Sequence, residues 1–162
     1  MVRLTRLGAK GAMLDVYEDA IQELCQEVEY LTDEALLTLL DPDSKDENCR
    51  SIQTILGHVV GSAFSYAIYI QELSGEGDPR PGLRLRDTVL AYLQDLNDAF
   101  AFTLTVFEAL SDSDLEKFDP KEKIHSRWQQ TYDIEQMMEH AIVHVLRHTR
   151  QIEKFKRRLE IL

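Results

Sequence analysis

Long segments with apolar side chains at helical spacing constrain the fold of this chain most strongly. They cover residues 13–31, 51–73, about 85–110 and about 133–160. Within each segment apolar residues recur every three or four positions, as one face of an α-helix requires. This face includes Val16 and Tyr17 in the first segment, and in the last it consists of Met138, Ala141, Val145, Ile152 and Phe155. Gly and Pro number only 7 and 4 among 162 residues, so few positions interrupt these helices. The pattern predicts an all-α protein.

The connections between these segments are polar and differ in character. Residues 32–50 predict a short helical turn and then a loop, and residues 74–82, SGEGDPRPG, end the second helix. Residues 111–132 form a long polar connection, after which Asp133 and Gln136 have the spacing of a capping box. A chain of this length fits one domain, so we expect residues 1–162 to form a single antiparallel bundle of four helices.

Charge and composition exclude several classes of partner. Acidic residues outnumber basic ones, 29 to 18, and a net charge of -11 repels nucleic acid. The charge-free stretch 51–71 contains His58 and several serines and glutamines, which is typical of a buried helix rather than a membrane span. Two cysteines are too few for a disulfide framework, and the chain does not open on a secretory leader. We therefore expect a cytoplasmic protein that binds neither nucleic acid nor membrane.

Histidines carry the strongest functional signal. Three of the five, His140, His144 and His148, lie four residues apart in HAIVHVLRH. Side chains at i and i+4 share a helix face about 6 Å apart, so two such imidazoles bind one zinc-type ion from adjacent turns. A helical wheel places His148 and His144 at the edge of the apolar face and His140 further out. His144 and His148 are therefore the predicted ligands, and His140 is a candidate for the rim of the site.

A third ligand is needed, because two histidines hold a metal weakly. His58, in the second helix, shares a face with Ser62, Ser65 and Tyr69, and this face predicts the wall of a small polar cavity. Three histidines leave one coordination position open for water or substrate. Helical spacing alone does not bring His58 to the last helix, so ordinary packing of these histidines and polar groups, without a metal, remains an alternative. Gly57 and Gly61, beside His58, leave room for a neighbouring backbone.

Other residues near the predicted site have more than one interpretation. Gln151, one turn beyond His148, either orients a ligand histidine or makes an unrelated polar contact. Trp128 and Tyr132 precede the last helix, and as large apolar residues we interpret them as packing rather than as a roof over the cavity. Arg147 and Arg150 fall on the outer helix face, which disfavours an anionic cosubstrate. We assign no catalytic residue, since neither Cys25 nor Cys49 has a base in a local motif.

Several segments resemble the DinB/YfiT-like family of metalloenzymes. They are LTDEALL after the first helix, SIQTILGHVV in the second, ALSDSDLEKF after the third and HAIVHVLRHTRQI in the last. The last segment is similar to the closing signature of the family, a histidine, three residues, then His-x-x-Gln-Ile, which maps onto His144, His148 and Gln151. The first ligand of the family maps onto His58. Arg150 departs from the pattern, because a glycine commonly precedes the glutamine.

The resemblance implies an up-down-down-up four-helix bundle with zinc or nickel on three histidines, often as a homodimer. Known activities in the family include transfer of low-molecular-weight thiols to electrophiles and a thiol-dependent isomerisation. The expected function is therefore that of a metal-dependent thiol S-transferase or hydrolase with an open coordination position. The alternative is a non-catalytic dimeric binding protein whose metal is structural or vestigial.

Overall fold

The structure, a computed structural model, describes residues 5–161. The long elements in this range are α1 Gly8–Val28, α3 Ile52–Gln71, α4 Val89–Glu108 and α5 Ile134–Arg158. Two short strands, β1 Ile124–His125 and β2 Thr131–Tyr132, pair antiparallel in the connection before α5. The all-α class predicted from the sequence is confirmed, and the strand pair is an addition that helical periodicity did not predict.

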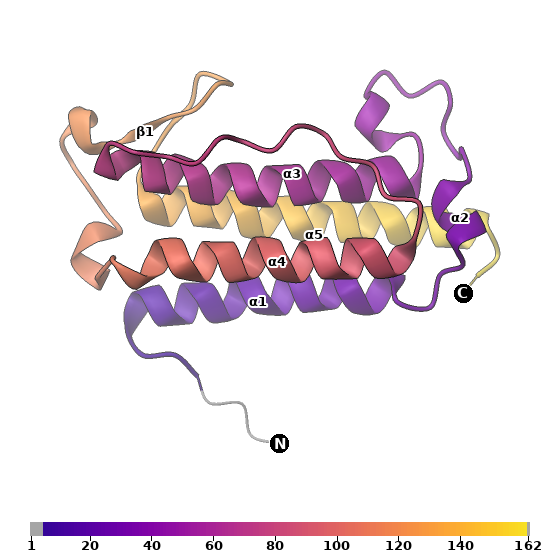
Figure 1. Ribbon diagram of the computed structural model, residues 1–162, viewed down its shortest axis with the longest axis horizontal. Coiled ribbons are helices and arrows are strands. Elements are labelled where there is room, and N and C mark those ends of the chain that lie inside the picture. The colour runs from indigo at the N-terminus through magenta and orange to yellow at the C-terminus, as the bar shows by residue number, and fades with distance from the viewer. Residues whose placement is uncertain (1–4, 162) are drawn as a thin grey trace.

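The long helices lie side by side, and their directions follow from the chain path in Figure 1. Helices α1 and α5 run one way, and α3 and α4 run the other way. Helix α3 packs against both α4 and α5, and α1 packs against the same two helices. Because α3 and α4 point the same way, residues 75–88 must travel back along the helices before α4 begins. We call residues 75–88 the return segment.

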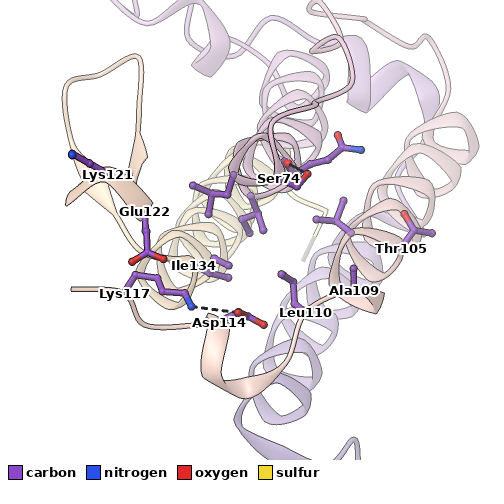
Figure 2. Close-up of a pocket in the computed structure, with 13 residues that line it drawn as sticks. Ser74, Thr105, Ala109, Leu110, Asp114, Lys117, Lys121, Glu122 and Ile134 are labelled. Carbon is purple, nitrogen blue, oxygen red and sulfur yellow. Dashed lines mark hydrogen bonds and ion pairs between the residues drawn. The ribbon is translucent and has the colours of Figure 1, made fainter. Parts of the chain in front are cut away.

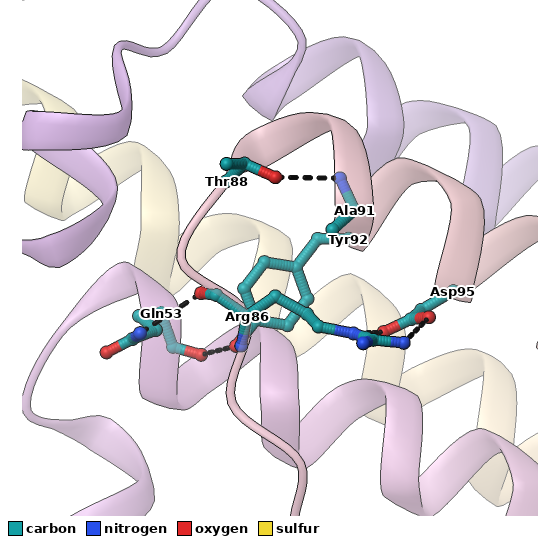
Figure 3. A network of polar contacts seen from close by, with 6 residues as sticks. All are labelled: Gln53, Arg86, Thr88, Ala91, Tyr92 and Asp95. Carbon is teal, nitrogen blue, oxygen red and sulfur yellow. Dashed lines mark hydrogen bonds and ion pairs between the residues drawn. The ribbon is translucent and has the colours of Figure 1, made fainter.

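A polar network fastens the end of the return segment to α3 and α4 (Figure 3). The guanidinium of Arg86 donates two hydrogen bonds of 2.7 Å to the carboxylate of Asp95. The hydroxyl of Tyr92 accepts from the backbone N–H of Arg86 at 3.0 Å and donates to the carbonyl of Gln53 at 2.8 Å. Gln53 Nε2 in turn donates to the carbonyl of Arg86 at 3.0 Å. These contacts set where the segment crosses α3.

Gly57 allows the return segment to lie directly on α3. A Cβ atom at Gly57 would stand 3.0 Å from Cδ2 of Leu85 and 3.4 Å from the carbonyl oxygen of Arg84. The close backbone approach expected at this glycine is therefore present. At Gly61 a Cβ atom would meet nothing within 4 Å, so no neighbour uses the space that this glycine leaves.

The core lies between the long helices. Its largest fully buried side chains on these helices are Tyr17, Leu24, Ile52, Ile55, Leu56, Ile68, Tyr92, Leu96, Phe107, Met137 and Met138. All members of the apolar face predicted for the last helix are buried, namely Met138, Ala141, Val145, Ile152 and Phe155. Val16, assigned to the apolar face of the first helix, is 52% exposed. That assignment was wrong because Val16 is rotated by about 100° from the buried Tyr17.

The capped starts of α2 and α5 agree with the sequence, whereas the start of α4 differs from the prediction. The capping box that opens α5 is present, with Asp133 Oδ1 accepting from the Gln136 N–H at 2.9 Å. The short helical turn expected after the first helix is α2 Asp33–Leu37. Helix α4 begins at Val89 rather than near residue 85, because the side chain of Thr88 caps it. Within residues 5–161 no helix has both the length and the apolar character needed to cross a bilayer.

Candidate metal centre

Three histidines from two helices converge on one point. His58 comes from α3, and His144 and His148 come from successive turns of α5. One ring nitrogen of each lies within 4.8 Å of the others. The Nε2 atoms of His58 and His144 are 3.0 Å apart. The predicted meeting of His58 with the α5 pair therefore occurs in the structure.

These distances suit ligands of one ion. Nitrogens bound at 2.0–2.1 Å to a tetrahedral ion lie about 3.3 Å apart, close to the separation of the His58 and His144 Nε2 atoms. A donor set of imidazoles alone suits zinc, copper, iron or nickel. Within residues 5–161, these three residues form the group of histidine, cysteine, aspartate or glutamate side chains that meets metal-ligand distances.

Burial keeps the three imidazoles uncharged. His148 is 5% exposed, and His58 and His144 are partly buried. Burial is the main reason that the pKa of His58 and of His148 falls below its ordinary value. It also lowers the pKa of His144 to about 3, with a smaller contribution from the neighbouring histidines. At neutral pH all three rings therefore offer a lone pair, which is the form that binds a metal.

Gln151 orients His148. Its Oε1 atom lies 3.0 Å from His148 Nδ1, and because an amide oxygen only accepts, the ring nitrogen donates. This hydrogen bond fixes the tautomer and leaves the Nε2 lone pair for the ion. The Cys49 thiol lies 3.7 Å from the same Oε1. Of the two interpretations of Gln151, this hydrogen bond agrees with orientation of the His148 ring.

His144 differs from His148 in the hydrogen bonding of its Nδ1 atom. The Nδ1 atom of His144 is buried, and no described residue makes a hydrogen bond to it. The protein around the ring therefore does not fix which nitrogen of His144 carries the proton. An ion bound at Nε2 would fix it, because metal binding there requires the proton to be on Nδ1.

A cavity of about 480 Å³ opens beside the histidines. His58 and His144 line it, whereas His148 lies outside its wall. The residues expected in this wall, Ser62, Ser65 and Tyr69, are there, and so is the rim candidate His140. A molecule in the cavity therefore meets the metal centre from the side of His58 and His144.

Aromatic side chains form one wall of this cavity. The turn between β1 and β2 brings in Trp128, which is 41% exposed and lines the cavity. Its ring stacks on His140 at 5.5 Å and meets the edges of Tyr66 at 6.3 Å and Tyr69 at 5.6 Å. Trp128 therefore packs against its aromatic neighbours, as interpreted from the sequence, and also lines the cavity. Gln129 at φ 62° makes the tight turn that places this ring.

Tyr132 behaves differently from Trp128. It is absent from the cavity lining, accepts a hydrogen bond from Trp128 Nε1 at 3.1 Å, and its hydroxyl lies 3.4 Å from His140 Nδ1. These contacts agree with the packing role predicted for Tyr132. They also hold His140 within the aromatic cluster, where its ring centroid stays 6.4 Å from that of His144.

Two arginines that the sequence pattern did not indicate line the cavity. Arg80, from the return segment, and Arg127, from the turn before β2, both line the cavity. Arg147 and Arg150, the cations considered from the sequence, are exposed and lie outside the cavity lining. Helical periodicity says nothing about the course of connecting segments, so it offered no signal for either cavity arginine.

A larger cavity, of about 540 Å³, lies at the C-terminal ends of α3 and α4 (Figure 2). Its lining combines apolar residues such as Ile134 with an ion pair of 3.3 Å between Lys117 and Asp114. It contains no histidine or cysteine. The smaller cavity is therefore the candidate functional site, since it adjoins the converging histidines.

Comparison with known family models, curated proteins and solved structures finds no match to this chain.

Proposed function

We propose that the protein binds one zinc or nickel ion on His58, His144 and His148 and acts as a metal-dependent thiol S-transferase or hydrolase of the DinB/YfiT type. The fold that goes with this proposal is an up-down-down-up four-helix bundle, in agreement with the helix directions in Figure 1. The observation that carries the proposal is the convergence of three neutral imidazoles, two of which line the wall of a cavity. The family resemblance further suggests a homodimer, and the two isolated cysteines suggest a reducing, cytoplasmic location.

In this proposal one set of residues holds the ion and another lines the cavity that admits a substrate. An ion with an open position lowers the pKa of a bound thiol or water and so supplies a nucleophile at neutral pH. His58, His144 and His148 would hold it, and Gln151 keeps His148 in the binding tautomer. A cavity of about 480 Å³ has the size of a small-molecule site, so an organic substrate of either reaction fits beside the ion.

The non-catalytic alternative predicts a closed site with a fourth protein ligand. Within residues 5–161, the group at metal-ligand distances contains three side chains. The nearby Cys49 thiol is directed to Gln151 and Asp46 rather than to the histidines. A cavity borders His58 and His144, as an open site requires. The described geometry thus favours an accessible ion.

Metal content tests the first half of the proposal. Protein purified without a histidine tag should contain about one ion per chain by plasma mass spectrometry. His58→Ala and His144→Ala should lose it, because two imidazoles hold an ion weakly. His125→Ala is the matched control, since His125 is exposed in β1 and lies outside the group. Full metal occupancy in both ligand variants, with folding verified by circular dichroism, would refute the assigned ligands.

Thiol conjugation tests the second half. Metal-loaded protein should accelerate the reaction of a small thiol with a model electrophile, and chelator-treated protein should not. The reaction is followed by the loss of free thiol. Equal rates with and without the ion would exclude the transferase while leaving the metal centre intact.

A further inference from the structure

Two arginines mark the end of the cavity away from the histidines, and both are placed by Tyr69. The guanidinium of Arg80 lies 4.1 Å from the centroid of the Tyr69 ring. The backbone N–H of Arg127 donates to the Tyr69 hydroxyl at 3.0 Å. Tyr69 follows His58 by three turns of α3, which corresponds to about 16 Å along the helix axis. The arginines therefore stand well apart from the metal centre within the same cavity.

This end of the cavity carries a net positive charge. Arg80 Nη1 and Nη2 are hydrogen-bonded to Glu72 at 2.8 Å and 2.6 Å. Arg127 is exposed and takes part in none of the ion pairs found among residues 5–161. The cavity lining contains no aspartate or glutamate. Two arginines against one glutamate leave one net positive charge beside Tyr69.

One donor of Arg80 lacks a partner. Its Nε–H is buried, and no described residue accepts a hydrogen bond from it, although the side chain is only 16% exposed. A buried donor without an acceptor is unfavourable by about 1–3 kcal/mol in proteins generally. Arg80 lines the cavity, so its incompletely satisfied guanidinium belongs to the side chain that an anion in the cavity would meet through charge-assisted hydrogen bonds.

Aromatic rings line the cavity between its two ends. The Trp128 ring lies 5.6 Å from Tyr69, on the arginine side, and 5.5 Å from His140, on the histidine side. Tyr66 bridges the same interval, 5.6 Å from His144 and 6.3 Å from Trp128. The middle of a bound molecule would therefore lie against apolar ring surface.

We propose that the cavity binds an elongated organic acid, with its carboxylate at the guanidinium groups of Arg80 and Arg127 and its apolar body against Trp128 and Tyr66. The opposite end of the molecule reaches the ion on the histidines, and this part alone rests on the proposed function. A carboxylate suits the arginine end because each of its two oxygens can accept from one of the two guanidinium groups.

Trp128 provides the assay. It is the one tryptophan of the 162-residue sequence and it lines the cavity, so its fluorescence reports occupancy. Metal-loaded protein is titrated with mercaptoundecanoate and, separately, with the uncharged mercaptoundecanol. Both probes have the same thiol and chain, so the ratio of their affinities isolates the carboxylate. We expect the acid to bind about tenfold more tightly, and the ratio to fall as salt rises.

Variants assign the preference to the arginines. Arg127→Gln should remove most of the acid preference. Glu72→Gln should increase it, because Arg80 then lacks its counter-charge. Arg84→Gln is the matched control. It removes the same charge from the return segment at a residue that does not line this cavity. Equal affinity of the native protein for acid and alcohol, or an equal loss in Arg84→Gln and Arg127→Gln, would overturn the proposal.

A separate measurement distinguishes this proposal from the metal chemistry. In cobalt-substituted protein, coordination of the probe thiol changes the visible absorption of the ion. An acid preference without that change would leave the arginine site standing and count against the metal-dependent transferase. A change in absorption with no acid preference would support thiol binding at the metal and overturn the arginine site.

Discussion

Metal-free protein should lose stability when the pH falls from about 7 to about 5, and His144 is the main reason. Burial lowers the pKa of His144 to about 3 in the folded protein, whereas an unfolded chain has an ordinary histidine pKa of about 6.5. Between these values the unfolded state binds a proton and the folded state does not. Stability is therefore fully present above pH 6.5 and is lost as the pH falls toward about 3.

The expected loss follows from this difference. Over the interval from about pH 7 to about pH 5, proton uptake by the unfolded state at His144 amounts to about 2 kcal/mol in the free energy of unfolding. Burial lowers the pKa of His58 and His148 in the same direction, so these histidines add to the loss. The total is a large fraction of the 5–15 kcal/mol that is typical of single domains.

Urea unfolding at the two pH values, with chelator present, measures this effect. The midpoint should fall at the lower pH while the slope of the transition stays constant. His144→Gln cannot take up the proton, so its stability should depend less on pH by about 2 kcal/mol. The exposed His125, replaced in the same way, is the control for loss of a histidine outside the candidate centre. The reasoning is refuted if the native protein is equally stable at both pH values, or if His144→Gln loses as much stability as the native protein.

Three further substitutions test the fold. Leu24→Ala, at a fully buried position of α1, should cost about 3 kcal/mol in urea unfolding, and Leu90→Ala, 77% exposed, should cost well under 1 kcal/mol; similar costs would contradict the described core. Asp133→Ala removes the cap of α5 and should cost about 1 kcal/mol, with an unchanged midpoint as the contrary result. Tyr92→Phe removes the hydroxyl that accepts from Arg86 and should cost about 1 kcal/mol, with faster tryptic cleavage of the return segment; native-like cleavage would show that other contacts hold it.

The α5 half of the candidate metal centre was predictable because it depends on local geometry. His144 and His148 lie one turn apart in any α-helix, and the buried stripe of α5 determines how far each ring reaches toward the core. Gln151 follows His148 by one further turn, so its contact with Nδ1 is also local. The same periodicity misplaced Val16, because a face defined by apolar residues alone is broader than the face that packing buries.

The other half of the centre is a long-range contact. The chemistry of His58 and its charge-free helix was visible in the sequence, but its distance from α5 depends on how two helices pack. The course of the return segment, which brings in Arg80, and the tight turn at Trp128 were invisible to helical periodicity, because neither segment is helical.

The sequence by itself determined the helices, their caps and the residues able to bind a metal, since each of these follows from neighbours within one or two turns. Tertiary structure alone decided that α3 brings His58 against α5, and that two connections close the cavity with an aromatic wall and two arginines. Contacts between residues far apart in the chain depend on the packing of whole elements, which no local pattern encodes.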